Sequence, residues 1–171
     1  MRNVIFGGVA LLIFVLGGFY LLSRNQTSTP PVSLSTKNEA TASVKTAPGF
    51  QGKLLAGKAA PFLEFNQADY EKALSEGKII LLDFYANWCP ICRGEEPAIH
   101  QGFDGLTSDQ VIGFRVNFND SETDQDEENL AKQFNVPYQH TKIILKNGEE
   151  FSRSSLSWDQ ETFRMELGKA L

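Results

Sequence analysis

The chain has little cysteine and little histidine, with only two of each among its 171 residues. A zinc site made of four cysteines is therefore excluded for a single chain. Both cysteines, Cys89 and Cys92, lie in one ten-residue segment, DFYANWCPIC (83–92). Two thiols at this spacing can serve a structural disulfide, a metal site or reversible redox chemistry, and the surrounding residues must distinguish these uses.

Basic residues are also scarce, since 16 lysines and arginines stand against 21 aspartates and glutamates, giving a net charge of −5. Without a basic surface to displace the counterions of a phosphate backbone, nonspecific nucleic-acid binding is excluded. Apolar residues are not scarce, because they make up 42% of the chain, with 22% charged. This composition predicts a folded domain rather than a disordered chain.

One long apolar run lies near the start of the chain, from Val4 to Leu22. As a helix it would be about 28 Å long, enough to cross a bilayer core. Polar residues follow it instead of a cleavage site, which favours a retained anchor at 1–22 over a removed signal peptide. Arg2 favours a cytoplasmic amino terminus. We therefore expect a single-pass protein of the inner (cytoplasmic) membrane, with its soluble domain facing the periplasm or extracytoplasmic space.

Residues 23–49 are rich in Ser, Thr, Pro and Ala and contain no aromatic residue, which is typical of a flexible linker. From residue 50 onward, short apolar runs alternate with segments of helical periodicity. The folded domain is therefore expected to cover 50–171.

Alternating and helical patterns predict the elements of this domain. The expected strands are 61–65, 78–86, 111–118, 141–146 and 150–153, and the expected helices are 67–75, 90–103, 127–134 and 158–171. Asn147-Gly148 predicts a hairpin between the last two strands, and Ser155 or Ser157 is available to cap the last helix. This order predicts an α/β fold with a mixed central sheet and helices on both faces.

The two cysteines fall at the junction of the expected 78–86 strand and the helix beginning at Pro90. Cys89 would occupy the cap position, where unpaired N–H groups and the helix dipole favour its thiolate form. Cys92 would lie one turn inward and be the more shielded thiol, placed to resolve a mixed disulfide on Cys89. A purely structural disulfide would close so short a loop that it would stabilise the fold little.

Asp83 is a lone carboxylate in an apolar strand. If it is buried, desolvation should raise its pKa and suit it to exchange a proton with Cys92. The alternative is a solvated carboxylate at a strand end. Glu95 and Glu96 follow the cysteines, and both are expected to be exposed on the helix.

The segment from Asp83 to Cys92 closely resembles the active-site segment of the thioredoxin family. Pro97, inside the following helix, and the hairpin sequence KNGE (146–149) extend the resemblance over about 61–171. It implies a thioredoxin-like fold and thiol–disulfide exchange on protein substrates, with no cofactor beyond a redox-active Cys89–Cys92 disulfide.

Carried over by position, the resemblance implies that Cys89 is the nucleophile, Cys92 the resolving thiol and Asp83 the buried carboxylate beneath them. It places Trp88 beside the site, and it implies substrate contacts from Trp88, Pro90, His140 and Thr141. Arg115 would take the place of a family lysine near the carboxylate.

The chain departs from the family at the cis-proline that faces the cysteines. Counting back from the hairpin places His140-Thr141 where the family has Pro-Thr, so His140 would replace that proline. Pro137 is the other candidate, but it requires about three extra residues. An imidazole near two thiols could complete a soft-metal set of Cys89, Cys92 and His140, whereas a tolerated surface histidine, as expected for His100, is the plain alternative.

These patterns and the resemblance together predict a membrane-tethered thiol–disulfide oxidoreductase. The resemblance implies the reducing direction, because anchored members of the family often reduce protein cysteines. We expect a monomer whose partners are protein thiols or disulfides and a membrane electron donor. The alternative is a copper carrier that uses Cys89, Cys92 and His140. The acidic segment 120–128 lacks the spacing of a calcium loop and is interpreted as a solvated loop that favours the start of the next helix.

Overall fold

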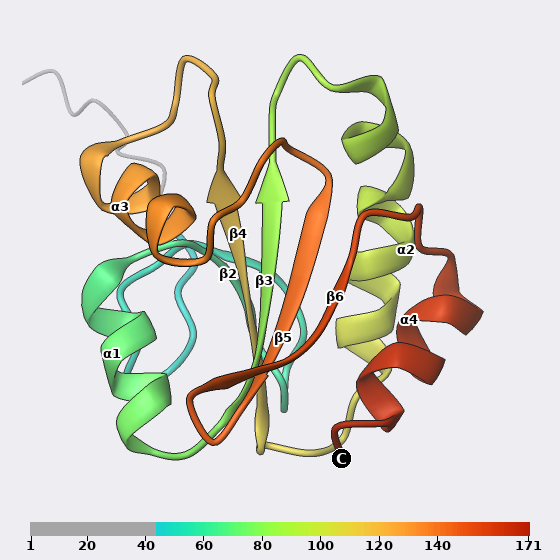
Figure 1. Ribbon diagram of the computed structural model, residues 1–171. Coiled ribbons are helices and arrows are strands. Elements are labelled where there is room, and N and C mark those ends of the chain that lie inside the picture. Colours follow the sequence, from blue (N-terminus) through green and yellow to red (C-terminus); the bar gives the residue numbers. More distant parts are fainter. Residues whose placement is uncertain (1–43) are drawn as a thin grey trace, which may run out of the picture. The chain divides into compact units, whose positions relative to one another are not determined.

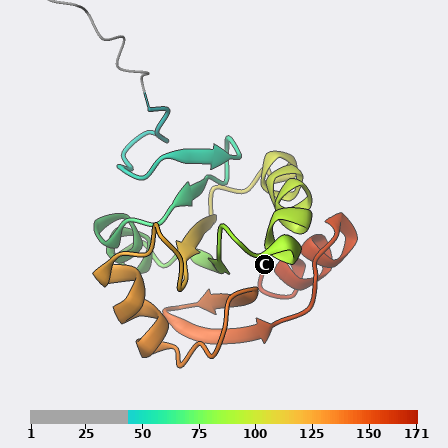
Figure 2. The same ribbon diagram turned by 90° about the horizontal axis from the view of Figure 1, so that it is seen from above.

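Six strands form one mixed sheet, with helices on both of its faces, in the computed structural model, which describes residues 44–171 (Figure 1). The strands lie in the order β1-β2-β4-β3-β5-β6. In chain order the elements are β1 (Leu54–Ala56), β2 (Phe62–Glu64), α1 (Gln67–Ser75), β3 (Ile79–Tyr85), α2 (Pro90–Gly105), β4 (Val111–Asn117), α3 (Gln125–Gln133), β5 (Thr141–Lys146), β6 (Glu149–Ser154) and α4 (Gln160–Gly168). Helices α1 and α3 cover one face, and α2 and α4 cover the other (Figure 2).

The expected anchor at 1–22 and most of the expected linker at 23–49 lie outside the described residues. Within residues 44–171, no helix combines the length and apolar character needed to cross a membrane. The described part includes the last residues of the expected linker. There Ala47 is buried in the core, and Thr46 forms a β-bridge with Lys53.

Strand β3 lies at the centre of the sheet, parallel to β4 and antiparallel to β5, and all seven of its residues are buried. Its side chains alternate between the two faces. Ile80, Leu82 and Phe84 join the core under α1 and α3, whereas Leu81 joins the core under α2 and α4. By this alternation Asp83 faces α2, so the one charged residue of β3 lies beneath the helix that carries the cysteines.

Close aromatic packing holds α2 and α4 against the sheet. The rings of Phe62 and Phe103 stack with their centroids 4.9 Å apart over Gly113, where an added Cβ would lie 2.3 Å from the Phe103 ring. Gly102 on α2 likewise admits the ring of Phe163 from α4, since a Cβ there would lie 2.4 Å from it. The missing side chains at these two glycines therefore fix how closely α2 approaches both β4 and α4.

Two details of the elements differ from the sequence prediction. Strand β1 was not predicted, because its residues, LLA, do not alternate between apolar and polar. The last helix is capped by Asp159 rather than Ser155 or Ser157, and the Asp159 carboxylate accepts a hydrogen bond from the Thr162 N–H at 2.8 Å. An aspartate caps as well as a serine, and here it lies in the correct register.

The carboxyl ends of β3 and β4 and the amino end of β5 meet at one end of the sheet, uppermost in Figure 1. This follows from the parallel pairing of β3 with β4 and the antiparallel pairing of β3 with β5. The loops that follow β3 and β4 and the loop that precedes β5 therefore share this end with the start of α2.

Candidate active site

The two cysteines lie at the start of α2, as the sequence predicts. Cys89 is the N-cap residue, with extended backbone angles, and Pro90 occupies the first turn. The N–H of Cys92 donates a hydrogen bond to Cys89 Sγ at 3.2 Å, and both thiols are free. A sulfur that accepts a helix-terminal N–H is placed where negative charge is favoured.

Both thiols are buried, each 3% exposed. The expectation that Cys92 is the more shielded thiol is therefore wrong. The N–H of Cys89 donates to the carbonyl of Ala86 at 3.0 Å, which folds the loop back so that both sulfurs pack with Tyr85 and Ala86. The Cys92 thiol holds its proton tightly. Burial, followed by the hydrogen bond with Cys89, raises the pKa of Cys92 to about 12.

Large exposed apolar side chains lie at the end of the sheet that carries the cysteines. Trp88, Ile91 and Tyr138 are about half exposed, and Pro90 is also exposed. Trp88 is held by its indole N–H, which donates to the carbonyl of Asn119 at 3.1 Å. The predicted substrate-contact residues Trp88 and Pro90 therefore lie at an accessible surface directly beside Cys89.

Asp83 is buried, as the strand pattern predicts, with 5% of its surface exposed. Desolvation raises its pKa to about 7, an effect opposed chiefly by the positive charge of Lys142 and then increased by Glu95. The alternative of a solvated carboxylate at a strand end is wrong. A carboxyl group with a pKa near neutrality can both accept and release a proton under ordinary conditions.

Asp83 has a cation beside it on each neighbouring strand. It is paired in register with Arg115 of β4 and with Lys142 of β5. Arg115 donates to Glu96 at 3.0 Å and to Glu64 at 2.9 Å. The prediction that Arg115 lies near the carboxylate is confirmed at the level of strand pairing.

Glu95 is buried, 6% exposed, so the expectation that it is an exposed helix residue is wrong. It forms an ion pair with Lys142, whose side chain is fully buried. Its second oxygen accepts the Trp158 N–H at 2.9 Å, and His140 Nδ1 lies 2.8 Å from the first. The sequence pattern did not single out Lys142, although its position two residues before the buried Ile144 places it on the α2 face of a central strand.

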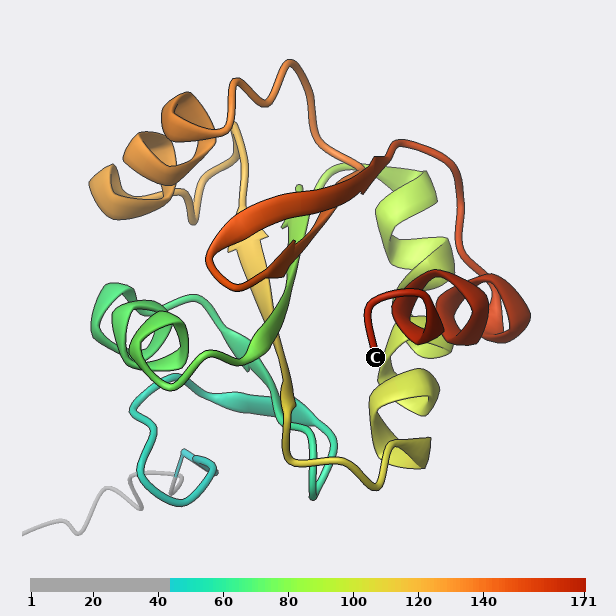
Figure 3. The same cartoon turned by 60° about the horizontal axis from the view of Figure 1, so that its bottom comes forward.

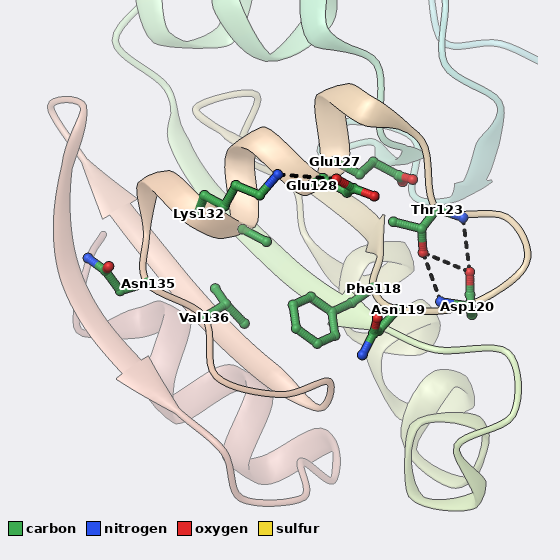
Figure 4. A pocket seen from close by; sticks show the side chains of 10 residues that line it. Phe118, Asn119, Asp120, Thr123, Glu127, Glu128, Lys132, Asn135 and Val136 are labelled. Carbon is green, nitrogen blue, oxygen red and sulfur yellow. Dashed lines mark hydrogen bonds and ion pairs between the residues drawn. The ribbon is translucent and has the colours of Figure 1, made fainter.

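A groove of about 730 Å³ lies beside the site, between α3 and the loops around it (Figure 4). Phe118 and Val136 form its apolar wall, and Asp120 and Thr123 lie at one end, joined by hydrogen bonds. Asp120 Oδ2 also accepts the Asn87 N–H at 2.8 Å. One carboxylate therefore connects the groove to the loop that carries Trp88.

The acidic segment 120–128 orders the start of α3. Asp124 and Glu127 form a capping box, in which each side chain accepts the other residue's N–H. Glu127 also accepts the Asn117 N–H at 2.7 Å. The predicted role at the helix start is confirmed, although Glu127 is buried rather than solvated, and burial raises its pKa to about 7.

The family model described as Thioredoxin matches residues 61–167, more than half of the chain. The chain belongs to the thioredoxin family. Thioredoxin H2 of Arabidopsis thaliana is 34% identical over 88 residues, which cover 51% of this chain and 59% of that protein. Thiol:disulfide interchange protein HelX of Rhodobacter capsulatus is 34% identical over 108 residues, 63% of this chain and 50% of that protein. The chain thus spans between half and three fifths of these relatives' lengths.

Solved structures show the same thioredoxin-like fold. The crystal structure of Trxlp from Edwardsiella tarda EIB202 superposes with a TM-score of 0.51 at 27% identity, covering 60% of this chain and 94% of that one. Thioredoxin O2 of Arabidopsis thaliana, in its oxidized state, gives a TM-score of 0.51 at 18% identity, covering 67% and 97%. These likenesses support the fold predicted from the sequence.

His140 differs from a proline in its backbone. Its φ is +69°, and its N–H donates to the carbonyl of Phe84 at 2.6 Å. A proline can have neither feature, because its φ is fixed near −65° and it lacks the N–H. His140 is buried and immediately precedes β5, so the interpretation as a tolerated surface histidine is wrong. Pro137, the other candidate, lies three residues earlier and is exposed.

Thr141 is fully buried, and its hydroxyl donates to the carbonyl of Tyr138 at 3.0 Å. Its side chain therefore holds the loop before β5 and does not face the surface where Trp88 lies. Any contact that Thr141 makes with a substrate would have to come from its backbone.

Cys89, Cys92 and His140 are not gathered into a metal site. Across residues 44–171 no group of three or more His, Cys, Asp and Glu side chains lies close enough to hold a metal ion. The imidazole of His140 is instead engaged by Glu95, and Lys142 Nζ lies 3.3 Å from its Nδ1. The imidazole therefore already has a carboxylate partner and a cation beside it, which disfavours a metal ion at that nitrogen.

Proposed function

We propose that the chain is a thiol–disulfide oxidoreductase that acts on protein cysteines through a Cys89/Cys92 cycle. The observation that carries this proposal is the asymmetry of the pair at the start of α2. Cys89 Sγ accepts the Cys92 N–H, whereas Cys92 holds its own proton tightly because it is buried. Such a pair supplies one thiol suited to attack and one that stays protonated until a base takes its proton.

In the reducing direction, the Cys89 thiolate attacks one sulfur of a substrate disulfide. The substrate S–S bond breaks, one substrate thiolate leaves, and a mixed disulfide forms on Cys89. Cys92 then gives its proton to Asp83 and attacks Cys89 Sγ. The second substrate thiolate leaves, so two electrons have passed to the substrate and the Cys89–Cys92 disulfide has formed. Asp83 is suited to this step because its pKa is near 7.

The proposed direction is reduction of the substrate. A dithiol becomes a strong oxidant when its reduced, thiolate form is stabilised. Cys89 Sγ accepts one N–H at the helix start, but burial raises the pKa of both Cys92 and Asp83, so ionisation of the rest of the site is opposed. Similarity to a relative named as a thiol:disulfide interchange protein supports the proposal that this chain exchanges disulfides with other proteins.

The proposed setting is the extracytoplasmic side of a membrane. The apolar run at 4–22 is long enough for an anchor, and the following 23–49 segment has a linker composition. Because residues 44–49 belong to the folded part, a flexible chain over 23–43 would have a root-mean-square span of roughly 25 Å. A monomer tethered this way could reach both protein substrates and an electron donor in the same membrane, and disulfide chemistry suits that compartment.

Substitution of single cysteines tests the proposed roles. The full-length Cys92→Ser variant, mixed with insulin as a disulfide-containing probe, is expected to accumulate a mixed disulfide because nothing resolves it. The Cys89→Ser variant is expected to accumulate little, because Cys92 is buried and retains its proton. Non-reducing electrophoresis and mass spectrometry measure both. Equal trapping by the two variants would reverse or abolish the assignment, and no trapping by either would contradict the function.

A further inference from the structure

We propose that the buried Lys142–Glu95 pair is a positioning group for the exchange reaction, because it sets how readily Asp83 takes the proton of Cys92. This inference rests on the proposed function. Neither residue lies on β3, the strand that carries Asp83. Lys142 is on β5, and Glu95 is on α2, one turn beyond Cys92.

The strand register places Lys142 directly beside Asp83. The two are partners in the antiparallel β3–β5 ladder, and both face α2. Cβ atoms of directly opposed residues in such a ladder lie about 5 Å apart. The ammonium group of Lys142 forms its ion pair with Glu95, which lies on α2, on the same face of the sheet as Asp83. Asp83 therefore lies between a Lys–Glu pair on one side and the Arg115–Glu96 pair on the other.

The Lys142–Glu95 pair is held in place by the connection between β6 and α4. Lys142 Nζ also donates to the carbonyl of Leu156 at 3.3 Å and lies 5.8 Å from the Trp158 ring centroid. Glu95 accepts the Trp158 N–H. Leu156 and Trp158 belong to the connection between β6 and α4, which runs on the α2 side of the sheet (Figure 3). Because both groups are fixed and shielded from water, their charges act on Asp83 with little screening.

The charges around Asp83 are nearly balanced. Lys142 pairs with Glu95, and Arg115 is shared between Glu96 and Glu64, the second of which also pairs with Lys53. The remaining titratable neighbours in the cluster are Cys92, on α2, and His140, before β5. Burial, and after it the charge of Lys142, lowers the pKa of His140, which favours the neutral imidazole. The loss of either member of the Lys142–Glu95 pair would therefore expose Asp83 to one uncancelled charge.

A purely stabilising role does not account well for this pair. Buried ion pairs contribute little net stability compared with apolar side chains of the same volume. The two roles also differ in what they predict. If the pair only supports the fold, loss of either member should affect the reaction in the same direction. If it tunes Asp83, loss of the cation and loss of the anion should act in opposite directions.

The test follows the second step of exchange alone. Reduced full-length protein is mixed with 5,5′-dithiobis(2-nitrobenzoic acid). Attack by Cys89 releases one thionitrobenzoate and forms a mixed disulfide, and attack by Cys92 on Cys89 Sγ releases the second. The rate of the second release is measured from pH 5 to pH 9. Its half-maximal pH reports when Asp83 is ionised and able to accept the Cys92 proton.

Lys142→Met leaves the Glu95 anion uncancelled and is expected to raise the half-maximal pH by about 1 unit, and Glu95→Gln is expected to lower it by about 1 unit. Lys142→Arg keeps the charge and is expected to leave the midpoint near that of the unmodified protein. The matched control is Glu166→Gln, which removes the Glu166–Lys169 pair on α4 and should not move the midpoint.

A swapped variant covers the case in which a single substitution prevents folding. Glu95→Lys combined with Lys142→Glu keeps an ion pair and the net charge but places the anion beside Asp83, so the midpoint should rise. Shifts of the same sign in both single variants, or an unmoved midpoint in the swapped variant, would overturn the proposal and leave the Cys89/Cys92 cycle intact. Absence of a second release in the unmodified protein would instead contradict the proposed function.

Discussion

Replacement of Asp83 by asparagine is expected to stabilise the reduced protein by about 2 kcal/mol at pH 8. Burial raises the pKa of Asp83 from 3.8 to about 7, so the folded protein binds this proton more tightly than the unfolded chain does. The resulting stability is fully present below about pH 4 and is lost as the pH rises through about 7. By linkage the loss is about 4 kcal/mol, part of which the variant does not regain because a buried amide without partners is itself unfavourable.

Urea unfolding of the reduced full-length protein at several pH values between 4 and 8 measures this effect. Glu127 also has a pKa raised to about 7, so it adds a pH dependence of the same sign. The difference between the unmodified protein and Asp83→Asn isolates Asp83. If the difference in the free energy of unfolding does not grow between pH 4 and pH 8, Asp83 ionises in the folded protein at little free-energy cost, which would contradict the prediction.

The same substitution is expected to slow the second step of exchange by about 100-fold at pH 7.5, because an asparagine side chain at this position could not accept the Cys92 proton. Attack by Cys89 should change much less. A variant that gains stability and keeps the rate of the second step would show that another group takes the proton.

Glu95→Ala is expected to destabilise the protein by about 3–5 kcal/mol, because it leaves the Lys142 ammonium buried without its counterion. Trp158 also loses the acceptor of its N–H. The double variant Glu95→Leu with Lys142→Leu should regain most of the loss, since two apolar side chains replace two buried charges. Urea unfolding measures the free energy of unfolding of each variant. The comparison holds if the slope of that free energy against urea concentration is the same in all of them.

Glu128→Ala is the matched control for this comparison. Glu128 pairs with Lys132 on the exposed face of α3, with N and O atoms 3.2 Å apart. Removal of such an exposed pair should cost less than about 0.5 kcal/mol. If Glu95→Ala costs no more than Glu128→Ala, the buried pair is solvated in solution and cannot act on Asp83 as proposed.

The sequence was sufficient for those parts of the site that depend on local rules. The change from a strand pattern to a helix pattern at Pro90 placed Cys89 at the cap, and the apolar run around Asp83 predicted its burial. Both predictions are confirmed. These features depend on residues close together in the chain, so spacing and residue type determine them.

The charges around Asp83 could not be predicted in the same way. Glu95 and Glu96 are adjacent, and their side chains point about 100° apart on a helix, so the sequence alone does not say which one meets β5. Lys142 was detectable in principle, as a lysine in a strand with apolar residues on both faces. Its partner became apparent only when tertiary packing brought α2, β3 and β5 together.

The reduction potential of the Cys89/Cys92 pair in the full-length protein is the most direct test of the proposed reducing dithiol. The protein would be equilibrated at pH 7 in glutathione buffers with a chelator present, and its free thiols counted by alkylation and mass spectrometry. We predict one reversible two-electron transition at or below about −230 mV. A midpoint near about −120 mV would show an oxidant that forms disulfides, and the absence of a reversible transition would contradict the Cys89/Cys92 cycle itself.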